Sequence, residues 1–80
     1  MGLKNMSMSF KDLTFGERLH WARFIRKLSI NELAERAGIH SNSLTNYEKD
    51  QHDPTFNVVC WLSEALDVSL DYLAGRSDEF

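Results

Sequence analysis

The chain has 80 residues, of which 42% are hydrophobic, and this length allows one small core while excluding a second domain or a deep active-site cleft. Its formal net charge of −3 excludes an indiscriminate binder of polyanions. The single cysteine, Cys60, excludes an intrachain disulfide, and no apolar run approaches the roughly 20 residues that a membrane span needs. Because the opening residues also lack a secretory signal, we expect a soluble, cytoplasmic protein.

The charges are unevenly distributed along the chain. From Arg18 to Arg36, five basic residues and two acidic residues give a local balance of +3 (5 − 2). From Ala37 to the end, two basic residues and eight acidic residues give −6 (2 − 8). One side of the fold is therefore expected to suit phosphates while another side repels them.

Helical periodicity starts after residues 1–13, which are expected to form a frayed tail. Thr14 and Glu17 have the spacing of a capping box, which predicts a first helix ending near Lys27. Ser29 repeats that pattern with a glutamate three residues later, which predicts a second helix over residues 30–37. In the second helix an apolar stripe of small and large residues is expected to face inward.

Gly38 marks the turn between the second helix and the third, because glycine readily adopts the left-handed conformation that ends a helix. A third helix is predicted over residues 41–49, with Leu44 and Tyr47 on its inner face. This inner face leaves four polar residues pointing outward as candidate base readers: Ser41, Asn42, Thr45 and Asn46. The two helices around one glycine form a helix-turn-helix pattern.

Two further helices are predicted after a polar loop that ends at Pro54. Thr55 is expected to cap a mostly buried fourth helix, within which Cys60 is a small core residue. Ser69 is expected to cap a short fifth helix that ends at Gly75. Strand-like alternation is absent, so residues 14–75 are predicted to form one all-α domain, followed by a polar tail over residues 76–80.

The same residues resemble the phage repressor and Cro family of DNA-binding domains over residues 14–75. The matching motifs, in order, are Phe15-Gly16-Glu17-Arg18-Leu19, Leu28-Ser29, Glu32-Leu33-Ala34, Ala37-Gly38-Ile39, Tyr47-Glu48 and Leu66-Asp67-Val68-Ser69-Leu70-Asp71-Tyr72-Leu73. The resemblance implies a compact five-helix domain of the lambda-repressor-like type, with the helix-turn-helix in its second and third helices. It also implies that the third helix lies in the major groove of DNA.

Ser41, Asn42 and Asn46 match the family's base-reading positions, and Thr45 can add a methyl contact to thymine. Asparagine can bond an adenine edge bidentately, whereas no Arg or Lys is present there for a strong guanine contact. Phosphate contacts are expected at the start of the second helix and around the loop after the third helix. The candidates are Lys27, Ser29, Asn31, Ser43, Lys49, Gln51 and His52.

Three residues depart from the family pattern. Ile30 replaces a glutamine that usually contacts phosphate, and Asp50 replaces a frequent glycine. Asp53 adds a second negative charge to a loop expected near phosphates. These departures are expected to weaken DNA binding more than they affect the fold.

Arg23 and Glu48 match a pair that in relatives forms a partly buried salt bridge; the alternative is a surface ion pair worth little. The resemblance also implies a homodimer on a near-palindromic operator, with reading helices roughly 34 to 36 Å apart. Val68, Leu70 and Tyr72 are the candidate dimer interface. We expect both surfaces to be needed for tight binding.

The sequence therefore predicts a sequence-specific regulator of transcription that binds double-stranded DNA, with repression as the expected effect. The alternative is a protein-binding module that engages another regulator through its acidic C-terminal half. An enzyme is not expected, since no nucleophile or acid–base set shares a plausible cleft. No membrane partner, small-molecule substrate, cofactor or metal is expected. The three histidines fit no metal-ligand pair, and the two tryptophans are expected to be packing or interface groups.

Overall fold

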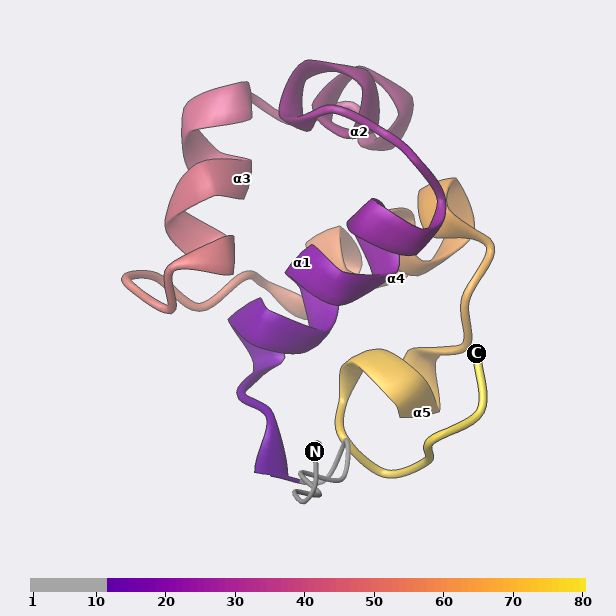
Figure 1. The fold of residues 1–80 in the computed structure, drawn as a ribbon. Coiled ribbons are helices and arrows are strands. Elements are labelled where there is room, and N and C mark those ends of the chain that lie inside the picture. The colour runs from indigo at the N-terminus through magenta and orange to yellow at the C-terminus, as the bar shows by residue number, and fades with distance from the viewer. Residues whose placement is uncertain (1–11) are drawn as a thin grey trace, which may run out of the picture.

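Four of the five described helices begin directly after the predicted capping residues, and the third begins at Ser41, where the sequence predicted it without a capping pattern. In the computed structural model, which describes residues 12–80, their bounds are α1 Phe15–Ile25, α2 Ile30–Ala37, α3 Ser41–Glu48, α4 Phe56–Leu66 and α5 Leu70–Leu73 (Figure 1). No strand occurs in this part of the chain, which confirms the all-α fold class. Of the tail predicted over residues 1–13, residues 1–11 lie outside the described residues.

Both predicted capping boxes form. The hydroxyl of Thr14 accepts from the Glu17 N–H at 3.1 Å, and the Glu17 carboxylate accepts from the Thr14 N–H at 2.9 Å. Ser29 and Glu32 make the same pair of bonds at 3.0 and 2.8 Å. Gly38 ends α2 in the left-handed conformation with φ of 74°. Because these capping bonds join residues only three apart in the chain, they define the helix starts without help from distant segments.

The helices pack around one shared core. α2 packs against α3 and α4, α1 packs against α3 and α5, and α4 also packs against α5. Figure 1 shows α1 crossing in front of α4, with α2 above it, α3 to its left and α5 below. The large side chains that are fully buried are Leu19, Leu33, Leu44, Leu62, Leu66, Tyr72 and Leu73. This core fixes the angle at which α3 stands out from the rest of the domain.

The prediction that α4 is mostly buried was wrong. Its buried residues are Leu62, Ser63 and Leu66, whereas Phe56 is 73% exposed. Cys60 is half-buried and does not belong to the core. α4 has apolar residues on more than one side, but its packing partners α2 and α5 cover only one of them.

The C-terminal segment folds back on the domain. The ring of Phe80 packs edge-on against Tyr72, with ring centroids 4.7 Å apart, and lies below the guanidinium of Arg26 at 5.1 Å. The Ser69 hydroxyl donates to the carbonyl of Glu79 at 3.0 Å. The segment predicted as a polar tail is therefore tied to α5 and to the end of α1. Within residues 12–80 no helix is both long and apolar enough to cross a membrane.

Candidate nucleic-acid interface

The outer face of α3 carries side chains that are free to bind a ligand. Leu44 is fully buried beneath this face and anchors it to the core. Asn42 is exposed, and the other three candidate readers are half-buried: Ser41, Thr45 and Asn46. Within residues 12–80 none of these four side chains has a hydrogen-bond partner. Their amide and hydroxyl groups are therefore available to base edges.

The amino end of α3 differs from the start of the other helices. Its N-cap residue, His40, makes no side-chain hydrogen bond to the helix. The other four helices of the described region are capped by hydroxyls, from Thr14, Ser29, Thr55 and Ser69. The first N–H groups of α3 thus remain open, and the helix dipole makes this end favourable for an anion.

The carboxyl end of α3 is tied to α1 by a bidentate ion pair. Nε of Arg23 lies 2.6 Å from Oε2 of Glu48, and Nη2 donates to Oε1 at 3.0 Å. The two side chains are 15% and 8% exposed, so the pair is the partly buried kind and not a surface contact. The hydrogen bonds that Arg23 donates to the Glu48 carboxylate raise the pKa of Arg23. Arg23 also donates to the carbonyl of Leu28 at 2.9 Å, so it joins α1, the following turn and α3.

His20 adds a third group to this contact, which the sequence reading did not anticipate. Its Nδ1 lies 3.0 Å from the Glu48 carboxylate and 3.2 Å from Nη2 of Arg23. The imidazole is more exposed than the ion pair it touches. Within the described residues no group of three or more His, Cys, Asp or Glu side chains could hold a metal ion.

Gly16 allows α1 to approach the end of α3 closely. A Cβ at this position would lie 2.6 Å from the backbone oxygen of Tyr47 and would also overlap that of Glu48. No real Cβ approaches an oxygen that closely, so only glycine fits without a shift of one helix. The sequence signal for this contact was the glycine inside the first-helix motif, a position where glycine otherwise lowers helix stability.

Asp50 has a structural role that the sequence did not indicate. Its charge was expected in a loop near phosphates, and its carboxylate also accepts hydrogen bonds at the start of α1. Oδ1 accepts from the Gly16 N–H at 2.9 Å, and Oδ2 accepts from the Thr14 hydroxyl at 2.5 Å. Aspartate is one of the few residues besides glycine that tolerates the left-handed backbone found here, with φ of 58°.

The start of α2 offers fewer free donors than the sequence suggested. The N–H of Ser29 is already bonded to the Glu32 carboxylate, so it is not available to a phosphate. The hydrogen bonds from Ser29 also lower the pKa of Glu32, which keeps a negative charge at this helix end. In the first turn of α2, the N–H groups of Ile30 and Asn31 lack an acceptor within residues 12–80. Asn31 is therefore the better phosphate candidate of the predicted pair.

Much of the local positive charge is used inside the domain. Arg18 is buried and donates to the carbonyl of Leu73 at 3.2 Å. Arg26 donates to the carbonyls of Leu66 and Asp67 at 2.8 and 2.7 Å, where it caps the end of α4. Together with the paired Arg23, three of the five basic residues of this region hold the fold together.

The remaining basic and polar candidates lie on the surface. Lys27 and Arg36 are exposed, and so are the candidates in and next to the loop after α3: Lys49, Gln51 and His52. Ser43 is half-buried on α3. The cationic surface is therefore smaller than the balance of +3 suggested.

The dimer-interface prediction needs correction. Val68 is 8% exposed and Tyr72 is fully buried, because both belong to the core of the domain. Of the three predicted residues, only Leu70 has a side chain that a second protein can reach. The accessible apolar surface in this region lies instead around a pocket between α1, α4 and α5.

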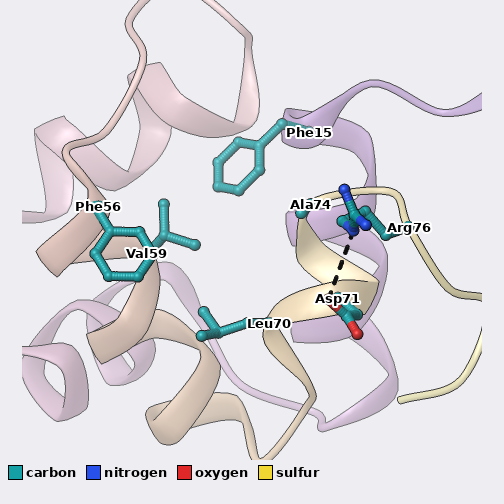
Figure 2. Close-up of a pocket in the computed structure, with 7 residues that line it drawn as sticks. All are labelled: Phe15, Phe56, Val59, Leu70, Asp71, Ala74 and Arg76. Carbon is teal, nitrogen blue, oxygen red and sulfur yellow. Dashed lines mark ion pairs between the residues drawn. The ribbon is translucent and has the colours of Figure 1, made fainter.

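This pocket has a volume of about 400 Å³ and is mainly apolar. Figure 2 shows Phe15 of α1 opposite Phe56 and Val59 of α4, with Leu70 of α5 at the base. At its edge Asp71 and Arg76 form an exposed ion pair at 3.9 Å. The pocket is on the α4–α5 side of the molecule that the sequence indicated, but of the three predicted residues only Leu70 lines it.

The fold and the arrangement of α2 and α3 define a helix-turn-helix domain of the lambda-repressor-like class. The model of the helix-turn-helix domain family matches residues 16–79, so the chain belongs to that family. Among its relatives, the HTH-type transcriptional regulator ImmR of Bacillus subtilis (strain 168) is 38% identical over 66 residues. That match covers 82% of this chain and 52% of ImmR, so the chain spans about half the length of that relative.

Two solved structures share the fold. The restriction-modification controller protein C.AhdI from Aeromonas hydrophila superposes with a TM-score of 0.72 at 29% identity, covering 74% of this chain and 89% of that one. The P22 c2 repressor, solved in complex with synthetic operator 9T in the presence of Tl⁺, gives a TM-score of 0.73 at 28% identity. That match covers 76% of this chain and 92% of the repressor. The three similar proteins are a transcriptional regulator, a controller protein and a repressor, which agrees with the expectation that this chain is not an enzyme.

Proposed function

We propose that this protein regulates transcription by binding double-stranded DNA, with the outer face of α3 in the major groove. The observation that carries the proposal is the state of α3 itself. Its amino end has no side-chain cap, and its four outward polar side chains have no partner within residues 12–80. Unpartnered donors and acceptors on one helix face suit the hydrogen-bonding pattern of base edges.

Phosphate contacts on either side of α3 would fix its register. Asn31, together with the free N–H groups at the start of α2, suits one strand of the backbone. Lys49, Gln51 and His52 suit a second contact beyond the other end of α3. We assign smaller roles to three further predicted residues: Lys27, Ser29 and Ser43. Such contacts supply most of the sequence-independent affinity.

We further propose that the protein binds as a homodimer through the pocket between α1, α4 and α5. A single reading helix contacts only a few bases, so two copies on a near-palindromic operator raise both affinity and specificity. Exposed Phe56 and Leu70 supply the apolar surface, and Asp71 and Arg76 at the edge carry charges that a two-fold partner can complement. By likeness to the P22 c2 repressor, we propose repression as the effect.

The decisive experiment is selection of bound sites from a random duplex pool, followed by a salt titration of binding. We expect a two-fold symmetric site with half-sites about one helical turn apart, and an affinity that falls steeply with salt. The Leu70→Asp variant should keep its fold, since Leu70 is exposed, but should lose dimerisation in sedimentation analysis. A protein with no affinity for any duplex at low salt would contradict the proposal.

A protein-binding module is the second candidate, and two observations favour it. The acidic C-terminal half suits a basic partner, and exposed aromatic residues lie on the outer face of α1. There Trp21 and Phe24 stack with ring centroids 5.8 Å apart, next to exposed Ile25. The salt titration separates the two functions. A DNA-binding protein loses affinity for random duplex DNA steeply as salt is added, whereas a module that binds only protein shows no duplex binding even at low salt.

A further inference from the structure

We infer that Asp50 is a positioning residue for DNA binding, which holds the loop after α3 against the start of α1. This inference rests on the proposed function, since it concerns the loop that carries Lys49, Gln51 and His52. It assigns to Asp50 a role opposite to the simple repulsion of phosphate that its charge suggests. The geometry on both sides of its carboxylate supports this assignment.

The first part of the geometry is the end of α3. The N–H of Asp50 donates to the carbonyl of Tyr47 at 3.1 Å, and the N–H of Gln51 donates to that of Asn46 at 2.9 Å. These bonds close the helix with Asp50 in the left-handed conformation. A glycine would make this turn with less strain, so the aspartate side chain needs another explanation.

The second part is the start of α1. The N–H of Gly16 belongs to the first turn, where no carbonyl of the same helix can accept it. Oδ1 of Asp50 accepts this N–H from 34 residues away, and Oδ2 accepts the hydroxyl proton of Thr14. The Thr14 hydroxyl in turn accepts from the N–H of Glu17. Asp50 therefore completes the capping of α1 and places its charge at the positive end of that helix dipole.

The close approach at Gly16 makes the contact stiff. A Cβ built on Gly16 would lie 2.8 Å from Oδ2 of Asp50 and 2.6 Å from the backbone oxygen of Tyr47, so the two segments are in direct contact. Asp50 lies between Lys49 and Gln51, so its contacts hold this loop in place next to the candidate phosphate-binding residues. A loop that is already ordered loses less conformational entropy when it binds a phosphate.

Two neutral substitutions separate the anchor from the charge. Asp50→Asn removes the charge but keeps an oxygen that accepts from the Gly16 N–H, and its amide N–H₂ can donate to the Thr14 hydroxyl oxygen, which reverses that hydrogen bond. Asp50→Gly removes the same charge and both hydrogen bonds, while it fits the left-handed backbone without strain. We expect Asp50→Asn to bind random duplex DNA more tightly than the wild type, because one negative charge is lost near the phosphates. We expect Asp50→Gly to bind about 5- to 10-fold more weakly than Asp50→Asn, the cost of ordering a free loop.

Amide hydrogen exchange in the free protein tests the anchor without DNA. The Gly16 N–H should exchange about tenfold faster or more in Asp50→Gly, and at nearly the wild-type rate in Asp50→Asn. The two affinities are compared at a temperature where both variants are fully folded. Equal DNA affinity under that condition would overturn the inference. If the wild-type protein failed to bind any duplex, the proposed function would fall instead. Unchanged Gly16 exchange in Asp50→Gly would by itself rule out the anchor.

Discussion

The two ends of α3 are built in opposite ways. The carboxyl end is held by the ion pair of Arg23 with Glu48, by the close contact at Gly16 and by the hydrogen bonds of Asp50. The amino end has no side-chain cap, and the polar residues that follow it have no partner in the described chain. The helix is therefore fixed at one end and open at the other.

This difference separates support from recognition. Groups that hold the helix are partly buried and satisfied, so replacing them should change stability first and DNA affinity as a consequence. Groups that meet a ligand must remain unsatisfied in the free protein, so replacing them should change affinity alone. The same contrast separates the start of α2, where a capping box bonds the N–H groups of Ser29 and Glu32, from the uncapped start of α3. Four sets of substitutions test these contrasts.

The largest loss of stability is expected from Gly16→Ala at the fixed end. The added Cβ would overlap backbone oxygens at the end of α3, and backbone cannot rotate away as a side chain can. We expect a loss of about 3 kcal/mol in the free energy of unfolding, measured by urea denaturation. Gly38→Ala is the control, because a Cβ added at Gly38 would have no atom within 4 Å. Its only cost is the strain of alanine at a φ of 74°, which we expect to be about 1 to 2 kcal/mol. Equal losses in both variants would mean that the α1–α3 contact is not tight.

Glu48→Ala should cost less, at about 2 to 3 kcal/mol, because it leaves a partly buried Arg23 without its partner. DNA affinity should fall as well, since α3 loses its attachment to α1. A double-mutant cycle with Arg23→Met is the control, and the double variant should lose less stability than the sum of the two single changes. An unchanged melting temperature for Glu48→Ala would refute this prediction.

On the outer face of α3, Asn42→Ala and Asn46→Ala should each weaken binding to a selected operator by about 1 to 2 kcal/mol. Their free energies of unfolding should stay within about 0.5 kcal/mol of the wild type, because neither side chain has a partner in residues 12–80. Asn57→Ala, at an exposed position of α4, is the matched control and should leave operator binding unchanged. If operator preference survived both α3 substitutions, another element would be the reader.

The smallest effect is expected at the capped start of α2. Hydrogen bonds from Ser29 lower the pKa of Glu32 in the folded protein, so its ionised form contributes stability above its unfolded pKa of about 4.3. That contribution is lost as the pH falls through the lowered folded value. Glu32→Gln should therefore unfold at lower urea than the wild type at pH 7, and the difference should shrink toward pH 3.

The same substitution also probes the phosphate contact next to Glu32. Loss of the negative charge beside the free N–H of Asn31 should raise the affinity for duplex DNA slightly, and this gain should shrink as salt is added. Glu17→Gln is the matched control, because it removes the same charge from the corresponding box of α1. An equal gain from both substitutions would show that the start of α2 has no special place in DNA binding.

The sequence alone determined the helices and the pattern of the helix-turn-helix. Thr14, Ser29, Thr55 and Ser69 cap helices through bonds that span three residues, and Gly38 ends α2 through its own backbone. Interactions of such short range depend only on neighbouring residues, so they can be read in order along the chain. The motifs that indicated the family rest on these same residues.

Only the tertiary structure decided which polar and apolar groups are free. Arg18 and Arg26 bond carbonyls 55 and 40 residues away, and Asp50 bonds an N–H 34 residues away. Tyrosine is a residue type that is common at interfaces, yet the packing of α5 against α1 buries Tyr72 in the core. Charge and hydropathy describe what a side chain can do, but the fold decides whether another part of the chain already uses it. For this protein, that decision leaves the outer face of α3 open.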